Sequence, residues 1–264
     1  MSLSFKHHPG LVAYVTCGDP DLATSREVIL AAIRAGADVI ELGVPFSDPV
    51  ADGPVIQRAS ERALRKGTSL ADVLKLAKEV RAKATGVGLL AFTYLNPLVR
   101  MGFQKFADTA KASGVDGVLV TDLPVEEAGE HLAIMRKANL DTVFLAAPTS
   151  PDERLKAIAG ASRGFVYAVS RTGVTGTRQE LAADASSLVS RIKRFTKLPV
   201  AVGFGISNAQ HFADVTKFAD AAVVGTAIVQ LIEKSSPAEA PQAVYNFLSG
   251  LRAGTSQAAQ STTK

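Results

Sequence analysis

Three carboxylates follow one another where an apolar run gives way to a loop. Glu41 lies near the end of the run 37–42, and Asp48 and Asp52 follow in a stretch rich in proline and glycine. A carboxylate that closes a buried strand is partly desolvated, which raises its pKa and suits it to general acid–base chemistry. The alternative for Glu41 is a structural carboxylate bound by backbone N–H groups or an arginine. For Asp52, position alone favours a turn residue before the helix expected near Pro54.

Other catalytic chemistries lack their usual residues in this chain. None of the strand ends carries a lysine, which argues against a Schiff-base aldolase. No two histidines have a metal-ligand spacing such as H-x-x-x-H, so we expect no zinc or other metal. The histidines are His7, His8, His131 and His211. Cys17, the single cysteine, has no histidine near it in the sequence and is expected to be a small buried residue rather than a nucleophile.

Composition and charge exclude several broad classes of protein. The chain has 264 residues, 47% of them apolar, so it can bury a large core. No apolar run reaches the roughly 20 residues of a membrane helix, and residues 1–10 lack the apolar segment of a secretory signal. The net charge of +4 is spread without a long Lys/Arg block, so we expect no nucleic-acid partner but allow a small anionic substrate. The single cysteine fits a reducing compartment, and we expect a cytoplasmic protein.

Eight short runs rich in valine, isoleucine and leucine predict β-strands. They cover residues 11–16, 37–42, 88–93, 117–120, 142–146, 164–169, 200–202 and 221–224. Amphipathic stretches after these runs predict helices over residues 24–35, 55–66, 70–84, 103–113, 126–138, 152–159, 181–195, 209–217, 227–232 and 237–251. The sequences SPDE at 150–153 and SNAQ at 207–210 are typical helix starts.

This alternation of strands and helices predicts an α/β protein with a parallel sheet. We expect a single (β/α)8 TIM barrel over residues 1–251, followed by a small polar tail, 252–264, that is disordered. A doubly wound open sheet is the alternative. It is disfavoured because the first strand–helix turn lacks G-x-G-x-x-G and no G-x-x-x-x-G-K-[ST] loop occurs.

In such a barrel the active site lies at the carboxyl ends of the strands. Three of these ends carry glycine-bearing turns, namely RTGVTGT, GFGIS and VGTAI. Glycine lets backbone N–H groups approach an anion closely, so the three turns together favour a phosphate site over ordinary turn chemistry. Aromatic residues near these ends could hold a flat apolar ligand or simply belong to the core. They are Tyr14, Phe92, Tyr94, Tyr167 and Phe204.

Longer segments of the chain resemble one known family. They are AYVTCGDPD, IELGVPFSDPVADGPVIQRA, AFTYLNPL, GVDGVLVTDLPVEE, FLAAPTSPDERL, GFVYAVSRTGVTG and VAVGFGIS, in this order between about residue 11 and about residue 231. These segments are similar to the signatures of the tryptophan synthase alpha chain. The part from Glu41 to Asp52 is highly specific, because several rigid residues recur there at fixed spacing.

The resemblance implies a (β/α)8 barrel that cleaves indole-3-glycerol phosphate to indole and D-glyceraldehyde 3-phosphate in tryptophan biosynthesis. It implies that Glu41 is the general acid and base and that Asp52 faces the indole N–H. The substrate would be contacted by Tyr94, Tyr167, Thr175 and Phe204, and its phosphate by Gly176, Gly205, Gly225 and Thr226. Residues 171–180 would form a mobile lid. An indole can itself accept the electrons of the broken C–C bond, which agrees with the lack of a lysine or a metal.

Members of this family work beside a pyridoxal-phosphate-dependent beta chain that takes up the indole. The resemblance therefore implies a tryptophan synthase beta chain as partner, in an alpha2-beta2 heterotetramer, with pyridoxal phosphate only in the partner and no cofactor in this chain. The implied contact residues are Asp48, Pro49, Asn96 and Pro124, all in loops, although proline there can also be a simple loop stiffener. Three alternatives stay open: a free-standing indole-3-glycerol phosphate lyase, another phosphate-binding barrel enzyme such as a sugar-phosphate isomerase, and an idle barrel that activates a beta chain.

Two features depart from the family pattern. The region before the first strand, residues 1–10, is short where relatives have a longer helical segment, so we expect one face of the barrel to be less well closed. Thr226 stands where many relatives have serine. Because threonine keeps a hydroxyl and a backbone N–H, this change leaves phosphate binding intact.

Overall fold

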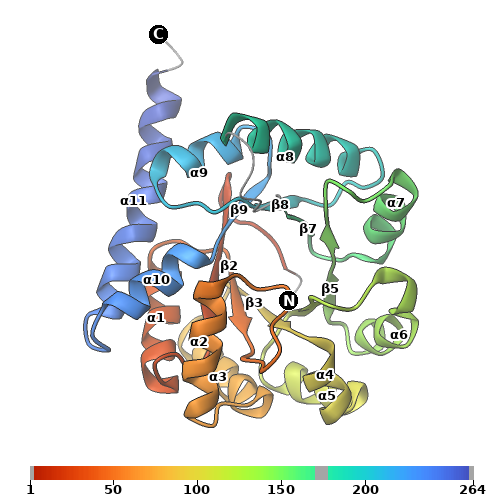
Figure 1. The fold of residues 1–264 in the computed structure, drawn as a ribbon, viewed down its shortest axis with the longest axis vertical. Coiled ribbons are helices and arrows are strands. Elements are labelled where there is room, and N and C mark those ends of the chain that lie inside the picture. The colour runs from red at the N-terminus through yellow and green to blue at the C-terminus, as the bar shows by residue number, and fades with distance from the viewer. Residues whose placement is uncertain (1–2, 170–177, 262–264) are drawn as a thin grey trace.

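The computed structural model describes residues 3–169 and 178–261, which form a ring of parallel strands surrounded by helices (Figure 1). The strands are β1 (Gly10–Thr16), β2 (Val39–Gly43), β3 (Gly88–Thr93), β4 (Gly117–Val120), β5 (Asp141–Val143), β6 (Leu145–Ala146), β7 (Val166–Val169), β8 (Val200–Gly203) and β9 (Ala221–Val224). Their order in the sheet is β5-β4-β3-β2-β1-β9-β8-β7-β6.

The sheet closes on itself at Phe144. β5 pairs with β4 and β6 pairs with β7, and these two short strands are halves of the single strand expected over 142–146. The Tyr167 N–H donates to the Phe144 carbonyl at 3.1 Å, so the break stays within the hydrogen-bonded ring. The expected (β/α)8 barrel is therefore confirmed, with one of its eight strands interrupted.

Two groups of helices follow the strands. The outer ring holds α1 (Leu22–Arg34), α3 (Leu70–Lys83), α5 (Phe103–Ala112), α6 (Gly129–Lys137), α7 (Asp152–Ala161), α8 (Arg178–Lys193), α9 (Ala209–Thr216) and α11 (Ala240–Ser261). Additional helices lie between a strand and the ring helix that follows it: α2 (Pro54–Arg65), α4 (Leu95–Met101), η1 (Val125–Glu127) and α10 (Thr226–Lys234). None of the helices within the described ranges has the length and apolar character needed to cross a membrane.

Helix starts agree with the sequence in part. Asn208 caps α9 by accepting the His211 N–H at 2.9 Å, as the SNAQ signal predicted. The SPDE signal is also followed by a helix, α7, which begins at the predicted residue 152. Its N-cap, however, is Pro151, and Ser150 instead accepts from the Ala147 N–H at 3.3 Å. α4 was not expected at all, since its sequence, LNPLVRM, contains a proline that suggests a loop.

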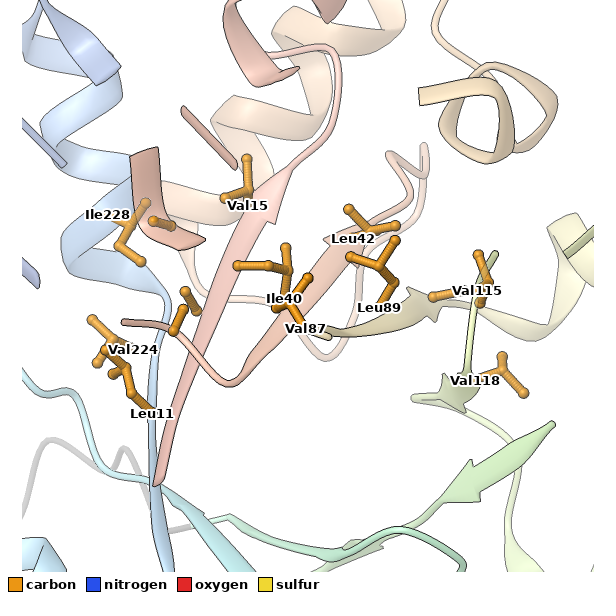
Figure 2. Close-up of a cluster of buried hydrophobic side chains, with 14 of the residues drawn as sticks. Leu11, Val15, Ile40, Leu42, Val87, Leu89, Val115, Val118, Val224 and Ile228 are labelled. Atoms are coloured by element: carbon orange, nitrogen blue, oxygen red, sulfur yellow. The ribbon is translucent and has the colours of Figure 1, made fainter. Parts of the chain in front are cut away.

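Apolar residues form one layer inside the barrel and another between barrel and helices. Ile40 and Leu42 of β2 point outward into the helix layer, together with Leu11 and Leu89 of the neighbouring strands (Figure 2). Successive side chains on a strand face opposite sides. Glu41, between Ile40 and Leu42, therefore points into the barrel.

Residues before β1 close the bottom of the barrel, which corrects the expectation of a less well closed face. Leu3 is buried among the inner-layer residues, and its N–H donates to an oxygen of Asp141 at 2.7 Å. Phe5 packs on Phe165 with ring centroids 5.5 Å apart. A Cβ at Gly117 would lie 2.8 Å from the Leu3 side chain, so the small residue there makes room for this plug.

Four aspartates at strand starts fasten the bottom of the barrel. Each accepts at least one backbone N–H with its carboxylate: Asp38 from Leu11, Asp116 from Leu89, Asp141 from Leu3 and Asp220 from Val200, at 2.7–2.9 Å. Each also pairs with a cation, namely Arg252, Arg81, Arg163 and Lys193 in the same order. The strand amides of Leu11, Leu89 and Val200, and the amide of Leu3 in the segment before β1, thus receive charged acceptors.

The C-terminal segment is helical beyond the expected boundary at residue 251. α11 runs to Ser261, although residues 252–264 were expected to be disordered. Arg252 bonds to the carbonyl of Pro9 at 3.3 Å and to Asp38 at 2.9 Å. The ordered domain therefore includes at least Arg252, which joins the last helix to the start of the chain.

Replacing Asp38 by alanine should destabilise the fold strongly. Its fully buried carboxylate accepts from the N–H groups of Lys6, His7 and Leu11 and pairs with Arg252. Removing one partner of a buried ion pair costs about 3–5 kcal/mol. Denaturant unfolding should show this loss in Asp38→Ala, while the exposed Asp108→Ala should stay within about 0.5 kcal/mol of the wild type. Equal stabilities for the two variants would contradict the role assigned to Asp38.

Candidate active site

Glu41 lies inside the barrel near its carboxyl-end mouth and is 1% exposed. Its Oε1 has no hydrogen-bond partner within the described part of the chain. Burial raises the pKa of Glu41 to about 8, so the carboxyl is mostly protonated at pH 7. A structural carboxylate would be satisfied by its neighbours and ionised. The geometry thus favours acid–base chemistry over the structural alternative.

Asp52 is half-buried in the loop between β2 and α2. Its backbone is in a turn, with its N–H donating to the Pro49 carbonyl at 3.0 Å, as position alone suggested. Its side chain does not cap α2, and instead accepts from the Tyr94 hydroxyl at 3.1 Å. Burial raises the pKa of Asp52 to about 6, and the Tyr94 hydrogen bond opposes that rise. At pH 7 Asp52 is therefore mostly ionised.

The two acids act electrostatically on the same two tyrosines, the buried Tyr14 of β1 and the partly exposed Tyr167 of β7. Burial raises the pKa of both phenols well above the ordinary value, and the charges of Asp52 and Glu41 add to the shift for each tyrosine. Such electrostatic contributions require that the groups lie near one another. Glu41 on its strand and Asp52 in the following loop therefore belong to one site at the barrel mouth.

Glycines on neighbouring strands make room for these tyrosines. A Cβ at Gly43 would collide with the Tyr14 hydroxyl, and one at Gly203 would lie 2.8 Å from the Tyr167 hydroxyl. Phe92 meets Tyr14 edge-on with ring centroids 5.2 Å apart. The mouth therefore has rigid aromatic walls, which suit a flat apolar ligand.

The described part of the expected phosphate site lies at α10 and the turn after β8. Gly225 is the N-cap of α10 and no side chain caps this helix end, so the N–H groups of its first turn, beginning with Thr226, can face an anion. Gly225 also approaches Tyr14, since an added Cβ would lie 3.4 Å from the Tyr14 Cβ. Gly205 is exposed and has a φ of +60°, a conformation that favours glycine. Thr175, Gly176 and most of the lid segment 171–180 lie outside the described residues.

Two further aromatic candidates differ in their surroundings. Phe204 is almost buried, between Gly203 and Gly205 at the end of β8. Tyr94 is 2% exposed; besides bonding Asp52 it accepts from the Ala51 N–H at 3.0 Å and stacks on Phe46. Tyr94 thus fixes the loop that carries Asp52, and its predicted contact with substrate stays a prediction.

The residues expected at a partner surface lie after β2, β3 and β4, on the same end of the barrel as Glu41. Asp48 and Asn96 are exposed, and Pro49 and Pro124 are half-buried. Asn96 lies in α4 rather than in the loop that the sequence suggested. Two large apolar side chains flank these residues and are exposed to solvent, Val50 by 84% and Val99 by 57%.

A cavity of about 360 Å³ opens between the loops that follow β4 and β6. Thr121, Asp122, Pro124 and Arg154 are among the residues that line it. Glu41 and Asp52 do not line it. It is therefore a hollow beside the mouth, next to the expected partner surface. Within the described ranges, no group of three or more His, Cys, Asp or Glu side chains is arranged to hold a metal ion.

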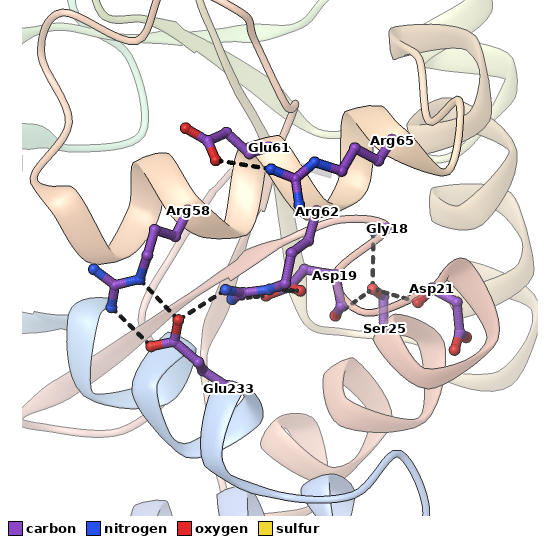
Figure 3. Close-up of polar contacts among 9 residues, drawn as sticks. All are labelled: Gly18, Asp19, Asp21, Ser25, Arg58, Glu61, Arg62, Arg65 and Glu233. Atoms are coloured by element: carbon purple, nitrogen blue, oxygen red, sulfur yellow. Dashed lines mark hydrogen bonds and ion pairs between the residues drawn. The ribbon is translucent and has the colours of Figure 1, made fainter.

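Sequence reasoning missed two contacts that shape this end of the barrel. Asp122 accepts the Leu95 N–H at 2.7 Å and so fixes the start of α4. Asp19 is 1% exposed and binds the Arg62 guanidinium through both carboxylate oxygens (Figure 3). The sequence around each aspartate gives no sign of these contacts, because the partners lie 43 and 27 residues away along the chain. Cys17 is fully buried and free, as expected, and burial raises the pKa of its thiol.

Comparison with known proteins gives one consistent result. The family model described as "Tryptophan synthase alpha chain" matches residues 2–256. Among curated relatives, the tryptophan synthase alpha chain of Solibacter usitatus is 51% identical over 238 residues, covering 90% of this chain and 89% of its own. That of Geobacter sulfurreducens is 47% identical over 250 residues, with 95% and 94% covered.

Solved structures agree with these relatives. Tryptophan synthase subunit alpha from Legionella pneumophila str. Paris superposes with a TM-score of 0.86 at 36% identity, covering 94% of this chain and 93% of that chain. A chain of the tryptophan synthase complex from Pyrococcus furiosus gives a TM-score of 0.85 at 40% identity, with 96% and 100% covered. The fold, the pair of acids at its mouth and these matches lead to one conclusion: the chain belongs to the tryptophan synthase alpha chain family.

Proposed function

We propose that Glu41 and Asp52 share the acid–base work of cleaving indole-3-glycerol phosphate to indole and D-glyceraldehyde 3-phosphate. The chain is a carbon–carbon lyase of the tryptophan synthase alpha family. The observation that carries the residue assignment is the difference between its two acids. At pH 7 one is a buried, mostly protonated carboxyl and the other a mostly ionised carboxylate, both beside Tyr14 and Tyr167.

The proposed steps balance without any further reagent. Protonated Glu41 gives its proton to C3 of the indole ring, which places positive charge on the ring nitrogen. Asp52, facing the indole N–H, stabilises that charge. The Glu41 carboxylate then removes the proton from the glycerol hydroxyl on the carbon next to the ring. The O–H electrons form the aldehyde C=O, the C–C bond breaks, and its electrons return to the ring nitrogen. Each such proton transfer is worth about 10² to 10⁴ in rate.

The substrate would lie across the mouth with its two ends held differently. The indole would lie between Tyr14 and Tyr167, with Asp52 at its nitrogen. The phosphate would be bound by the N–H groups at Gly205, Gly225 and Thr226, to which the sequence adds Gly176. The uncapped start of α10 and the open, positive-φ turn at Gly205 support this orientation.

A tryptophan synthase beta chain is the proposed partner, in an alpha2-beta2 heterotetramer that holds pyridoxal phosphate only in the beta chain. The relatives are alpha chains of a synthase, and the similar solved structures include complexes of it. These matches support the subunit role over the free-standing lyase that the sequence left open. Exposed Val50 and Val99 beside Asp48 and Asn96 provide an apolar area for the contact. A cytoplasmic location is part of the proposal, since the free Cys17 suits a reducing compartment.

Glu41→Gln should lose nearly all lyase activity and yet gain stability at high pH. The amide cannot donate and recover the proton, so indole release should fall at least about 10²-fold. The raised pKa of about 8 means that folding favours protonated Glu41. The contribution of protonated Glu41 to the stability of the wild-type fold is fully present below the ordinary pKa of about 4.3. It is lost as pH rises through about 8. Above pH 8 the variant, which has no charge to bury, should unfold at a higher temperature than the wild type.

The control for this experiment is Glu130→Gln, since Glu130 is exposed on α6. It should release indole at the wild-type rate and show no pH-dependent gain in melting temperature. Substantial activity in Glu41→Gln would sink the catalytic assignment. A melting temperature below that of the wild type at pH 8.5 would show that the carboxylate is stabilised by a partner.

The pH dependence of kcat/KM should be bell-shaped, with limbs near 6 for Asp52 and near 8 for Glu41. Because the Tyr94 hydroxyl bonds the ionised Asp52 and lowers its pKa, Tyr94→Phe should move the acidic limb upward by about one unit. The basic limb should not move. Tyr245→Phe, on α11, serves as the matched control and should leave both limbs in place. If Tyr94→Phe displaced the basic limb instead, the basic limb would belong to Asp52 and the acidic limb to Glu41.

Addition of a purified beta chain should stimulate indole release by the wild-type chain. Val99→Asp places a charge on the exposed apolar side of α4 and should weaken this stimulation while leaving the rate of the isolated chain unchanged. Titration of the beta chain against the lyase rate measures both effects. Full activity of the isolated chain with no response to the beta chain would favour the free-standing enzyme instead.

A further inference from the structure

Two of the additional helices, α2 and α10, lie side by side at the mouth of the barrel. α2 begins two residues after Asp52, and α10 begins directly after Gly225. Both pack on β1 and on each other, around a small buried cluster of Tyr14, Ala59 and Val229. One helix therefore follows the acid proposed for the indole end of the substrate, and the other carries the turn proposed for its phosphate.

An ionic network also joins the two helices, centred about one turn further along each helix than Ala59 and Val229 (Figure 3). The Arg62 guanidinium of α2 donates to Asp19 through Nε and Nη2 at 2.7 and 2.9 Å, and to Glu233 of α10 through Nη1 at 2.8 Å. Arg58 adds a second bidentate contact to Glu233 at 2.9 and 2.8 Å. Arg62 is the one member that bonds both carboxylates within the described ranges.

The network is anchored to the barrel through Asp19, three residues after the end of β1. Asp19 is buried, and the preceding residue, Gly18, donates its N–H to the Ser25 hydroxyl of α1 at 2.9 Å. α1 belongs to the outer ring of helices. Arg62 thus ties α2 and α10 to a part of the scaffold that takes no part in the proposed chemistry.

These contacts differ from an ordinary surface ion pair on a helix. Glu233 lies in the last turn of α10, where the helix dipole disfavours a carboxylate, so helix stability does not account for it. The arginines beside it hold its pKa at about 2. By contrast, Arg65 of α2 pairs with Glu61 one turn earlier on the same helix, and both side chains are exposed. Arg65 therefore offers a matched control.

We infer that Arg62 is a positioning residue that sets the separation between Asp52 and the phosphate turn at Gly225. The inference rests on the proposed function, in which one substrate must reach both. Neither α2 nor α10 is part of the outer ring of the barrel, so their relative placement depends on their contacts with β1 and with each other. A misplacement of about 1 Å between reacting groups can cost about 10² in rate. Arg62 should therefore matter for a ligand that spans both helices, and little for one that touches a single helix.

The test compares a ligand that spans the mouth with one that fills only its phosphate end. Arg62→Met keeps the length of the apolar stem and removes the guanidinium. Turnover of indole-3-glycerol phosphate should fall about 10- to 100-fold in kcat/KM, whereas the inhibition constant of glycerol 3-phosphate should change less than about threefold. Arg62→Lys should lie between, because an ammonium cannot bond Asp19 through two donors and Glu233 as well. Arg65→Met should match the wild type for both ligands.

Each outcome decides between the roles. Wild-type kcat/KM in Arg62→Met, or an equal loss for both ligands with a lowered melting temperature, overturns the positioning role. If Arg62→Met does not fold, Asp19→Asn and Glu233→Gln, which keep side-chain shape, must show the same split between the two ligands or the inference fails. A wild-type chain that does not cleave indole-3-glycerol phosphate, with or without a beta chain, refutes the proposed function rather than the positioning role alone.

Discussion

The site depends on one constraint, the burial of the Glu41 carboxyl inside a closed parallel barrel. Side chains alternate along a strand, and Ile40 and Leu42 face the helix layer, so the side chain of Glu41 must point into the barrel. A carboxylate buried without a partner is very unfavourable, and the pKa of about 8 shows how the fold avoids that cost by keeping the group protonated. The same circumstance that makes Glu41 acceptable in the core makes it an acid near neutral pH.

Asp52, eleven residues further along the chain, is kept mostly ionised at pH 7 rather than protonated. It lies in a loop, keeps partial access to water and receives a hydrogen bond from Tyr94, so it titrates near 6. Two carboxylates of similar intrinsic acidity thus differ in charge at pH 7 because one is on a strand and the other on a turn. Pairs of groups whose surroundings separate their pKa values in this way mark the acid and the charged stabiliser of a reaction.

Sequence alone could predict what depends on short-range patterns. The strands were found because runs such as those around Ile40 and Leu89 are apolar on one or both faces, and Glu41 could be placed at the mouth from its position in such a run. Contacts between distant residues could not be predicted. Asp19 meets Arg62 only after the barrel has closed, α4 begins where Asp122 supplies an acceptor, and Arg252 joins α11 to Asp38 although composition suggested a disordered tail.

The two ends of the barrel separate stability from chemistry. At the bottom, four aspartates satisfy backbone amides and pair with cations, and Leu3 and Phe5 fill the opening. At the top, Glu41, the two tyrosines and the turn proposed to bind phosphate lie near the mouth. The helices that pack beside them are α2 and α10. Since these helices rest on few elements, a small number of contacts such as the Arg62 network can set the geometry of the site. Changes there should alter the reaction more than the fold, and changes at the bottom should do the reverse.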